Sequence, residues 1–432
     1  MSNPNLDPQL KIGEQDLENA RSKLVDLVKG KEVTALERKA KIRKAAKTLS
    51  NELTPNEIFG TLQKKTIFDI NRSYHKLRKS AQVDAILDIA NQQRSQESDV
   101  EILDQLISSC YGPVKNQITN GFMVAPDDII GVFFEDEFLA RAHYPVPYII
   151  LPAFVEKLQW AWIGAAHEVG HHVYWQVSSL RDELDVRVAE ELATEGTSYP
   201  IQRLCFHWLE EIFSDLYGLL LMGRAFLLSG QTLYLYNSIS ANKLNQLPSD
   251  PDQQNSTIQK ILFESKSTRH PAPMVRANIG LYAYQKLMDS PTLIDVGQWD
   301  ANVAIAFQID FIPNPHTSSP EWVSEPPAEP LTEPLSYQVV TKAMKIVVNV
   351  LLTSKLYSLD NHSLEELVNF KNEETLRDSL FPQVKGNPLN PKKAQDIVTW
   401  AHSAAGKTID EDSAWRYWIA AQYLSNHNQT NV

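Results

Sequence analysis

The segment "AWIGAAHEVGHHVYW", residues 161–175, places His167 and His171 four positions apart, with Glu168 directly after the first histidine. Residues four apart lie on one face of an α-helix, with Cβ atoms about 5 to 6 Å apart. The two imidazoles can therefore bind one metal ion, and neutral imidazole suits zinc. Glu168 lies one position further round the helix, where a carboxylate can act as a general base rather than as a ligand.

The remainder of this segment predicts a helix that packs on one face and carries the metal ligands on another. Gly170 leaves room beside the histidines, and His172 points away from the metal-binding face, which favours a structural role. Apolar residues recur at helical spacing and predict the packing face: Trp162, Ala166, Val169 and Val173.

A catalytic zinc site requires three protein ligands and one open position, so a third ligand has to come from elsewhere in the chain. Metalloproteases of the metzincin kind supply it by continuing the motif as HExxHxxGxxH. This chain has Tyr174 and Val177 at the corresponding glycine and histidine positions. That source of a third ligand is therefore excluded.

The segment "CFHWLEEIFSDLYGLLLMG", residues 205–223, predicts a buried amphipathic helix that contains acidic residues. Burying an unpaired carboxylate is very costly, and a metal ion would compensate it. We expect Glu211 to be the third ligand and Asp215, one turn later, to accept a proton from the outer nitrogen of a ligating histidine. Glu210, about 100° round the helix, is the rival ligand, and His207 is a weaker one.

The motif HExxH followed by ExxxD resembles the gluzincin metallopeptidases, to which thermolysin and neprilysin belong. The match covers residues 167–171 and 211–215. The resemblance implies zinc on His167, His171 and Glu211, with Glu168 as the base and Asp215 supporting a ligand. It also implies a zincin-like catalytic core with a small β-sheet and an HExxH helix.

A third segment, "STRHPAPMVRANIG" at residues 267–280, resembles an element of the prenyl-protein peptidase family and of neprilysin. By that resemblance His270 would stabilise the oxyanion, and Arg276 would hold a substrate carbonyl or order the site. Peptide hydrolysis builds negative charge on the carbonyl oxygen, which a prepositioned donor stabilises. The alternative is a proline-bounded helix start with a surface arginine. Prenyl-protein peptidases are embedded in membranes, whereas we expect no membrane-spanning helix in this chain. We therefore do not expect it to act on their substrates.

The pattern along the chain predicts a mainly α (α+β) protein. We expect an N-terminal helical region (1–115), a metallopeptidase core (116–311), a Pro-rich linker or strap (312–335) and a C-terminal helical region (336–432). The runs "IIGVFF" (129–134) and "PYIILPAF" (147–154) predict strands of the core. Ser363 and Glu366 have the spacing of a capping box at the start of a C-terminal helix.

Composition restricts the function classes. The 432 residues carry a net charge of −12, which argues against a nucleic-acid partner because the phosphate backbone would be repelled. Cys110 and Cys205 form no CxxC pair, the N-terminus does not read as a signal peptide, and the longest apolar run (216–230) contains glycines and an arginine. We therefore expect a cytoplasmic protein without a membrane span.

These observations predict a zinc-dependent peptidase that acts on a peptide or protein substrate. The alternative is a zinc-stabilised binding or regulatory module whose peptidase activity is latent or lost. In a further alternative, the N-terminal helical region binds a regulatory partner that controls the active site.

Overall fold

The computed structural model describes residues 89–90, 92–94, 99–115, 129–134, 141–143, 148–177, 179–229, 271, 273–289, 337–386 and 389–427. The linker predicted at 312–335, His270 and most of the predicted N-terminal helical region lie outside these ranges. The chain divides into two compact units, one formed by residues 1–104 and 124–156 and the other by residues 105–123 and 157–432.

The first unit contains a small sheet of three strands, β1 (Ile130–Phe134), β2 (Arg141–His143) and β3 (Tyr148–Pro152), in the order β1-β3-β2. β1 pairs with β3 in parallel and β2 pairs with β3 antiparallel. Every residue of the central strand β3 is buried, as its continuous apolar sequence requires. The two predicted strands are confirmed as β1 and β3, whereas the three-residue β2 is an addition.

Side chains from the preceding helical segment bind the backbone of the edge strand β1. Gln93 donates to the carbonyl oxygen of Phe133 at 2.6 Å and accepts from its N–H at 3.1 Å. Asp104 accepts from the N–H of Gly131 at 2.6 Å and is paired with Arg94 at 2.8 Å. These contacts satisfy backbone groups that an edge strand otherwise exposes.

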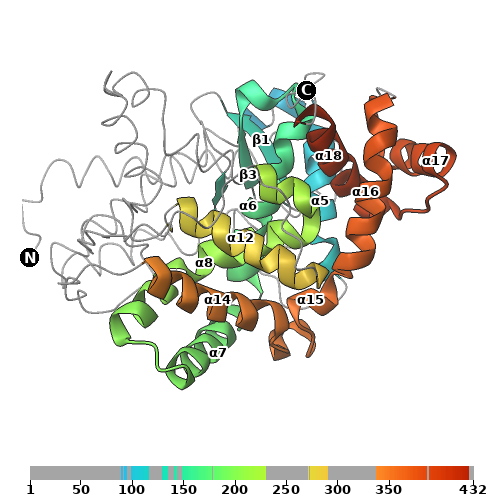
Figure 1. Ribbon diagram of the computed structural model, residues 1–432. Coiled ribbons are helices and arrows are strands. Elements are labelled where there is room, and N and C mark those ends of the chain that lie inside the picture. Colours follow the sequence, from blue (N-terminus) through green and yellow to red (C-terminus); the bar gives the residue numbers. More distant parts are fainter. Residues whose placement is uncertain are drawn as a thin grey trace, which may run out of the picture. The chain divides into compact units, whose positions relative to one another are not determined.

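The second unit is helical (Figure 1). In chain order it contains η3 (Gln159–Gly164), α6 (Ala165–Gln176), α7 (Leu180–Thr194), α8 (Tyr199–Met222), α12 (Pro273–Met288), α14 (Tyr337–Thr353), η4 (Tyr357–Leu359), α15 (Leu364–Leu367), α16 (Phe370–Gly386), α17 (Ala394–Ala405) and α18 (Glu411–His427). The last turns of α5 (Val100–Lys115) also belong to it. The predicted capping box is confirmed, since Ser363 and Glu366 each accept a hydrogen bond from the backbone N–H of the other.

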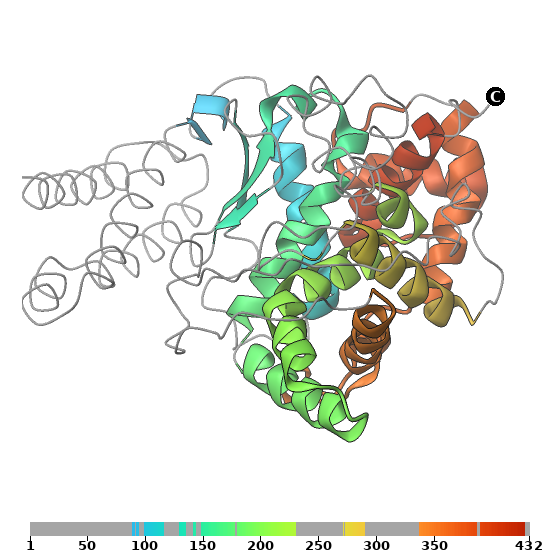
Figure 2. The ribbon, with the colours of Figure 1, turned by 60° about the vertical axis from the view of Figure 1, so that its left-hand side comes forward.

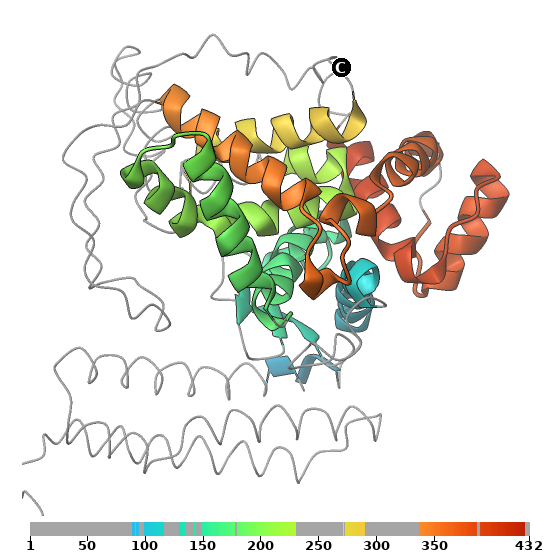
Figure 3. The ribbon, with the colours of Figure 1, turned by 90° about the horizontal axis from the view of Figure 1, so that it is seen from below.

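Helix α8 lies at the centre of this unit, where nearly all residues from Trp208 onward are buried. It packs along α6, and α14 packs against α7, α8 and α12 (Figures 2 and 3). Helix α18 packs against η3, α16 and α17. The C-terminal helices therefore support the same helices that carry the predicted metal ligands.

A buried polar network fixes the C-terminal end of α8. Arg377 of α16 donates to the carbonyl oxygen of Leu221 at 3.0 Å, satisfying an acceptor that the end of a helix leaves open. Glu374 accepts from the N–H of Arg224 at 3.1 Å, from the Tyr284 hydroxyl at 3.0 Å and from Arg377 at 2.8 Å. Gly223 has φ +60°, and a Cβ there would lie 1.7 Å from Glu374 Oε2, so only glycine fits.

None of the helices in the described ranges combines the length and apolar character that crossing a membrane requires.

Candidate metal centre

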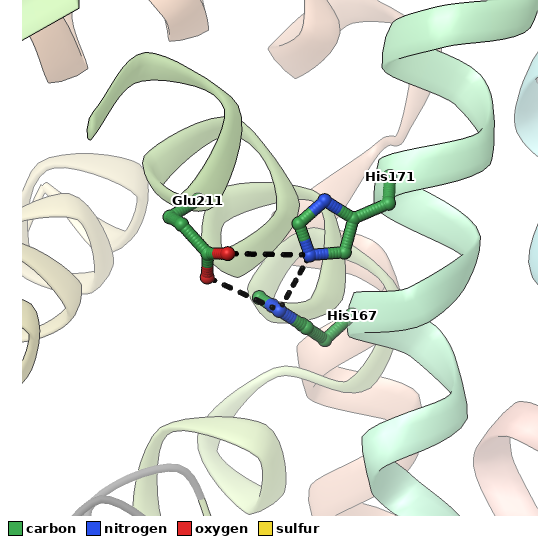
Figure 4. A group of neighbouring side chains, drawn as sticks. All are labelled: His167, His171 and Glu211. Atoms are coloured by element: carbon green, nitrogen blue, oxygen red, sulfur yellow. Dashed lines mark hydrogen bonds and ion pairs between the residues drawn. The ribbon is translucent and has the colours of Figure 1, made fainter. Parts of the chain in front are cut away.

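Two adjacent helices bring the predicted ligands together. His167 and His171 lie on α6, and Glu211 lies on α8 with its carboxylate directed at both imidazoles (Figure 4). One ligand atom from each of the three residues lies within 4.8 Å of the other two, so this group can hold a metal ion. The four-residue spacing read from the sequence places the histidines on one face, and the crossing of α8 adds the carboxylate.

The distances among the donor atoms fit a small cation. The two Nε2 atoms of His167 and His171 are 3.0 Å apart. They lie 3.6 and 3.7 Å from the two oxygens of Glu211. Zinc bonds of about 2.0 to 2.2 Å at tetrahedral angles place neighbouring donors roughly 3.3 to 3.5 Å apart. The observed distances lie on both sides of that value, so zinc fits with small adjustments of the side chains.

The outer ring nitrogens of both histidines also face carboxylates. His167 Nδ1 lies 3.0 Å from Asp215 Oδ1, and His171 Nδ1 lies 2.8 Å from Glu210 Oε1. A carboxylate in this position accepts the Nδ1 proton and leaves the Nε2 lone pair directed at the metal. Both rings are thus oriented for binding through Nε2.

Arg276 of α12 is ion-paired with two acidic residues of the site. It donates two hydrogen bonds of 2.7 Å to the carboxylate of Asp215, and one of its nitrogens lies 3.3 Å from Glu211 Oε2. Its side chain is 10% exposed, so the guanidinium is enclosed within the protein rather than displayed on the surface. In this arrangement Arg276 contacts two acidic residues of the predicted site.

The charges around the imidazoles favour a cation. Burial alone would lower the pKa of His171, but the nearby carboxylates of Glu211 and Glu210 outweigh burial and raise that pKa to about 10. Burial would raise the pKa of Asp215, but Arg276 and His167 outweigh it and lower the pKa to about 2. Asp215 is therefore a carboxylate at neutral pH, and the same negative charges that favour a proton on His171 favour a metal ion.

The remaining predicted residues fall into two groups. Glu168 is buried on α6, outside the set of three donors but close enough to raise the pKa of His171. His172 is fully buried and His207 is exposed. His270 lies outside the described residues, so its predicted role as oxyanion donor stays a prediction.

Besides the ion pair of Arg276 with Asp215, two other site contacts are not predicted by the sequence. The sequence places Glu210 only as a rival ligand, whereas in the structure it lies against the outer nitrogen of His171. Gly170, expected to leave room beside the metal, also faces α8, where a Cβ would lie 2.7 Å from Ser214 Cα. The sequence feature that could have predicted the role of Glu210 is its position next to Glu211 in an apolar helix. A carboxylate in such a helix is costly unless it has a partner, so Glu210 also requires one.

Comparison with known proteins gives no assignment, because no protein-family model, no curated protein and no solved structure matches this chain. The functional argument therefore rests on the residues of the site.

Proposed function

We propose that this protein is a zinc-dependent peptidase of the gluzincin type, with zinc held by His167, His171 and Glu211. The observation that carries the proposal is the convergence of these three side chains, with Glu168 next to the first ligand on the same helix. Within the described residues the group has three members. A tetrahedral zinc with three protein ligands keeps a fourth position for substrate or water, which is typical of catalytic rather than structural sites.

Zinc bound there would supply Lewis-acid chemistry to a scissile carbonyl. Glu168 would accept a proton from the attacking water and deliver it to the leaving amine, since it follows the first ligand on α6 without belonging to the group of three donors. Asp215 and Arg276 would keep His167 and Glu211 in place. The proposed reaction is therefore hydrolysis of a peptide bond in a peptide or protein substrate.

A peptide-library digest tests this function. The metal-free protein, the protein loaded with one equivalent of zinc and zinc-treated Glu211→Ala would each be incubated with a mixed peptide library, and cleavage would be read by mass spectrometry. We expect cleavage only with the zinc-loaded wild type, because the variant lacks a ligand. Zinc binding without cleavage of any peptide would contradict the peptidase proposal and support a zinc-stabilised binding module.

For Arg276 we propose a positioning role through Asp215 and Glu211 rather than contact with substrate. Removing one partner of a buried ion pair leaves an uncompensated charge, which costs about 3–5 kcal/mol. We expect Arg276→Ala to lower the free energy of unfolding of the metal-free protein by about that amount. Arg276→Lys should be milder, because lysine keeps the charge but cannot reproduce the two parallel hydrogen bonds.

Denaturant unfolding of the metal-free proteins would measure these changes. A substrate-binding arginine would behave differently, since its replacement by alanine would raise KM and leave the free energy of unfolding near the wild-type value. That result would favour the other role implied by the resemblance, in which Arg276 holds a substrate carbonyl.

A further inference from the structure

The contact between Glu210 and His171 gives the second metal-binding histidine its own orienting carboxylate. Oε1 of Glu210 lies 2.8 Å from Nδ1 of His171, while Nε2 of the same ring faces Glu211 and His167. The two nitrogens of an imidazole lie on different sides of the ring, and a cation would bind about 2 Å beyond Nε2. A carboxylate hydrogen-bonded to Nδ1 is therefore directed away from the cation.

We propose that Glu210 is a positioning residue that fixes the ring orientation and tautomer of His171 for metal binding. This inference rests on the metal site of the proposed function but not on the peptidase activity. Adjacent residues of one helix thus have separate tasks, with Glu211 as the ligand and Glu210 as the acceptor for the neighbouring ligand's outer nitrogen. Asp215 Oδ1 lies 3.0 Å from the outer nitrogen of His167.

The two orienting carboxylates differ in how they are held. The side chain of Asp215 is 10% exposed and has two hydrogen bonds from Arg276. The side chain of Glu210 is 33% exposed, and among the described residues no lysine or arginine pairs with it. Helix α8 sets the position of Glu210. When Glu211 faces the two histidines, the preceding residue, Glu210, lies alongside His171. Among the described residues, Glu210 is the carboxylate that is hydrogen-bonded to Nδ1 of His171.

Zinc affinity, measured by competition with a chromophoric chelator, tests the assignment. Loss of an outer-sphere partner typically lowers metal affinity by about 10- to 100-fold. We expect that loss for Glu210→Ala, with one zinc still bound at saturation. Glu210→Gln should lose less, because its amide oxygen still accepts from Nδ1. Glu211→Ala should lose more than either variant, because it removes a ligand.

The matched control is Glu191→Ala, which removes an exposed glutamate on α7 and should keep wild-type affinity. Imidazole NMR of the zinc-loaded proteins reports the protonation of Nδ1 of His171, which a general loss of stability would not change. We expect a protonated Nδ1 on His171 in the wild type, and a shifted or exchange-broadened Nδ1–H signal in Glu210→Ala.

Three results would overturn the proposal. If Glu210→Ala bound zinc as tightly as Glu191→Ala, the contact would have no role in metal binding. If Glu210→Ala lost zinc as completely as Glu211→Ala and Glu210→Gln gave no rescue, Glu210 would be a ligand. If the folded wild type bound no zinc, the metal site and the proposed function would fail together. The first result leaves that function intact, whereas the second would add a fourth protein ligand and count against an open catalytic position.

Discussion

Glu168→Gln is expected to keep zinc and to lose peptide hydrolysis. Glutamine has nearly the shape of glutamate but cannot accept the proton of an attacking water, and removing a general base typically costs about 100- to 10,000-fold in rate. Glu168 is buried on α6 and does not belong to the group of three donors, so zinc content should stay at the wild-type level. The measurements are kcat on a peptide cleaved by the wild type and zinc per protein.

The same two measurements separate this role from others. Glu191→Gln, an equivalent change on the exposed face of α7, should leave both values unchanged. Loss of zinc from Glu168→Gln would make Glu168 part of the metal-binding set rather than the base. Wild-type turnover in the zinc-loaded variant would show that the proton is accepted elsewhere.

The sequence predicted best the features that depend on residues close together in the chain. His167 and His171 share a face because their spacing matches the helical repeat, and this holds wherever the helix packs. The runs at 129–134 and 147–154 have apolar sequences typical of buried strands, and their residues 130–134 and 148–152 form strands β1 and β3. Ser363 and Glu366 interact across a single turn, so their spacing alone identifies the cap.

Features that depend on how helices cross could not be read from spacing. The sequence indicated that Glu211 is a better ligand than Glu210, but only the crossing of α6 and α8 brings Glu210 against the outer nitrogen of His171. The ion pair between Arg276 and Asp215 joins residues 61 positions apart on different helices. Strand β2 has three residues, too few for an alternating pattern to appear.

The largest structural effect is expected at Gly170, where the backbone of α8 lies directly against α6. A Cβ at this position would lie 2.7 Å from Ser214 Cα and 3.1 Å from Ser214 O, which are backbone atoms that cannot move unless the helix moves. Overpacking of this kind costs about 1–3 kcal/mol or more. Alanine favours helix by about 1 kcal/mol relative to glycine and offsets part of this. Valine adds further atoms, so Gly170→Val should be worse than Gly170→Ala.

Separating the two helices would also move Glu211 away from the histidines, and binding sites tolerate displacements of only about 0.5 Å. We therefore expect Gly170→Val to lower the free energy of unfolding and also to reduce zinc affinity more than tenfold, although residue 170 is not a ligand. Gly280→Ala is the matched control, because its Cβ would meet only the flexible end of Leu227 at 2.9 Å. That control should keep zinc affinity within about twofold of wild type. Tight zinc binding by a folded Gly170→Val protein would show that the site does not depend on this close approach of α6 and α8.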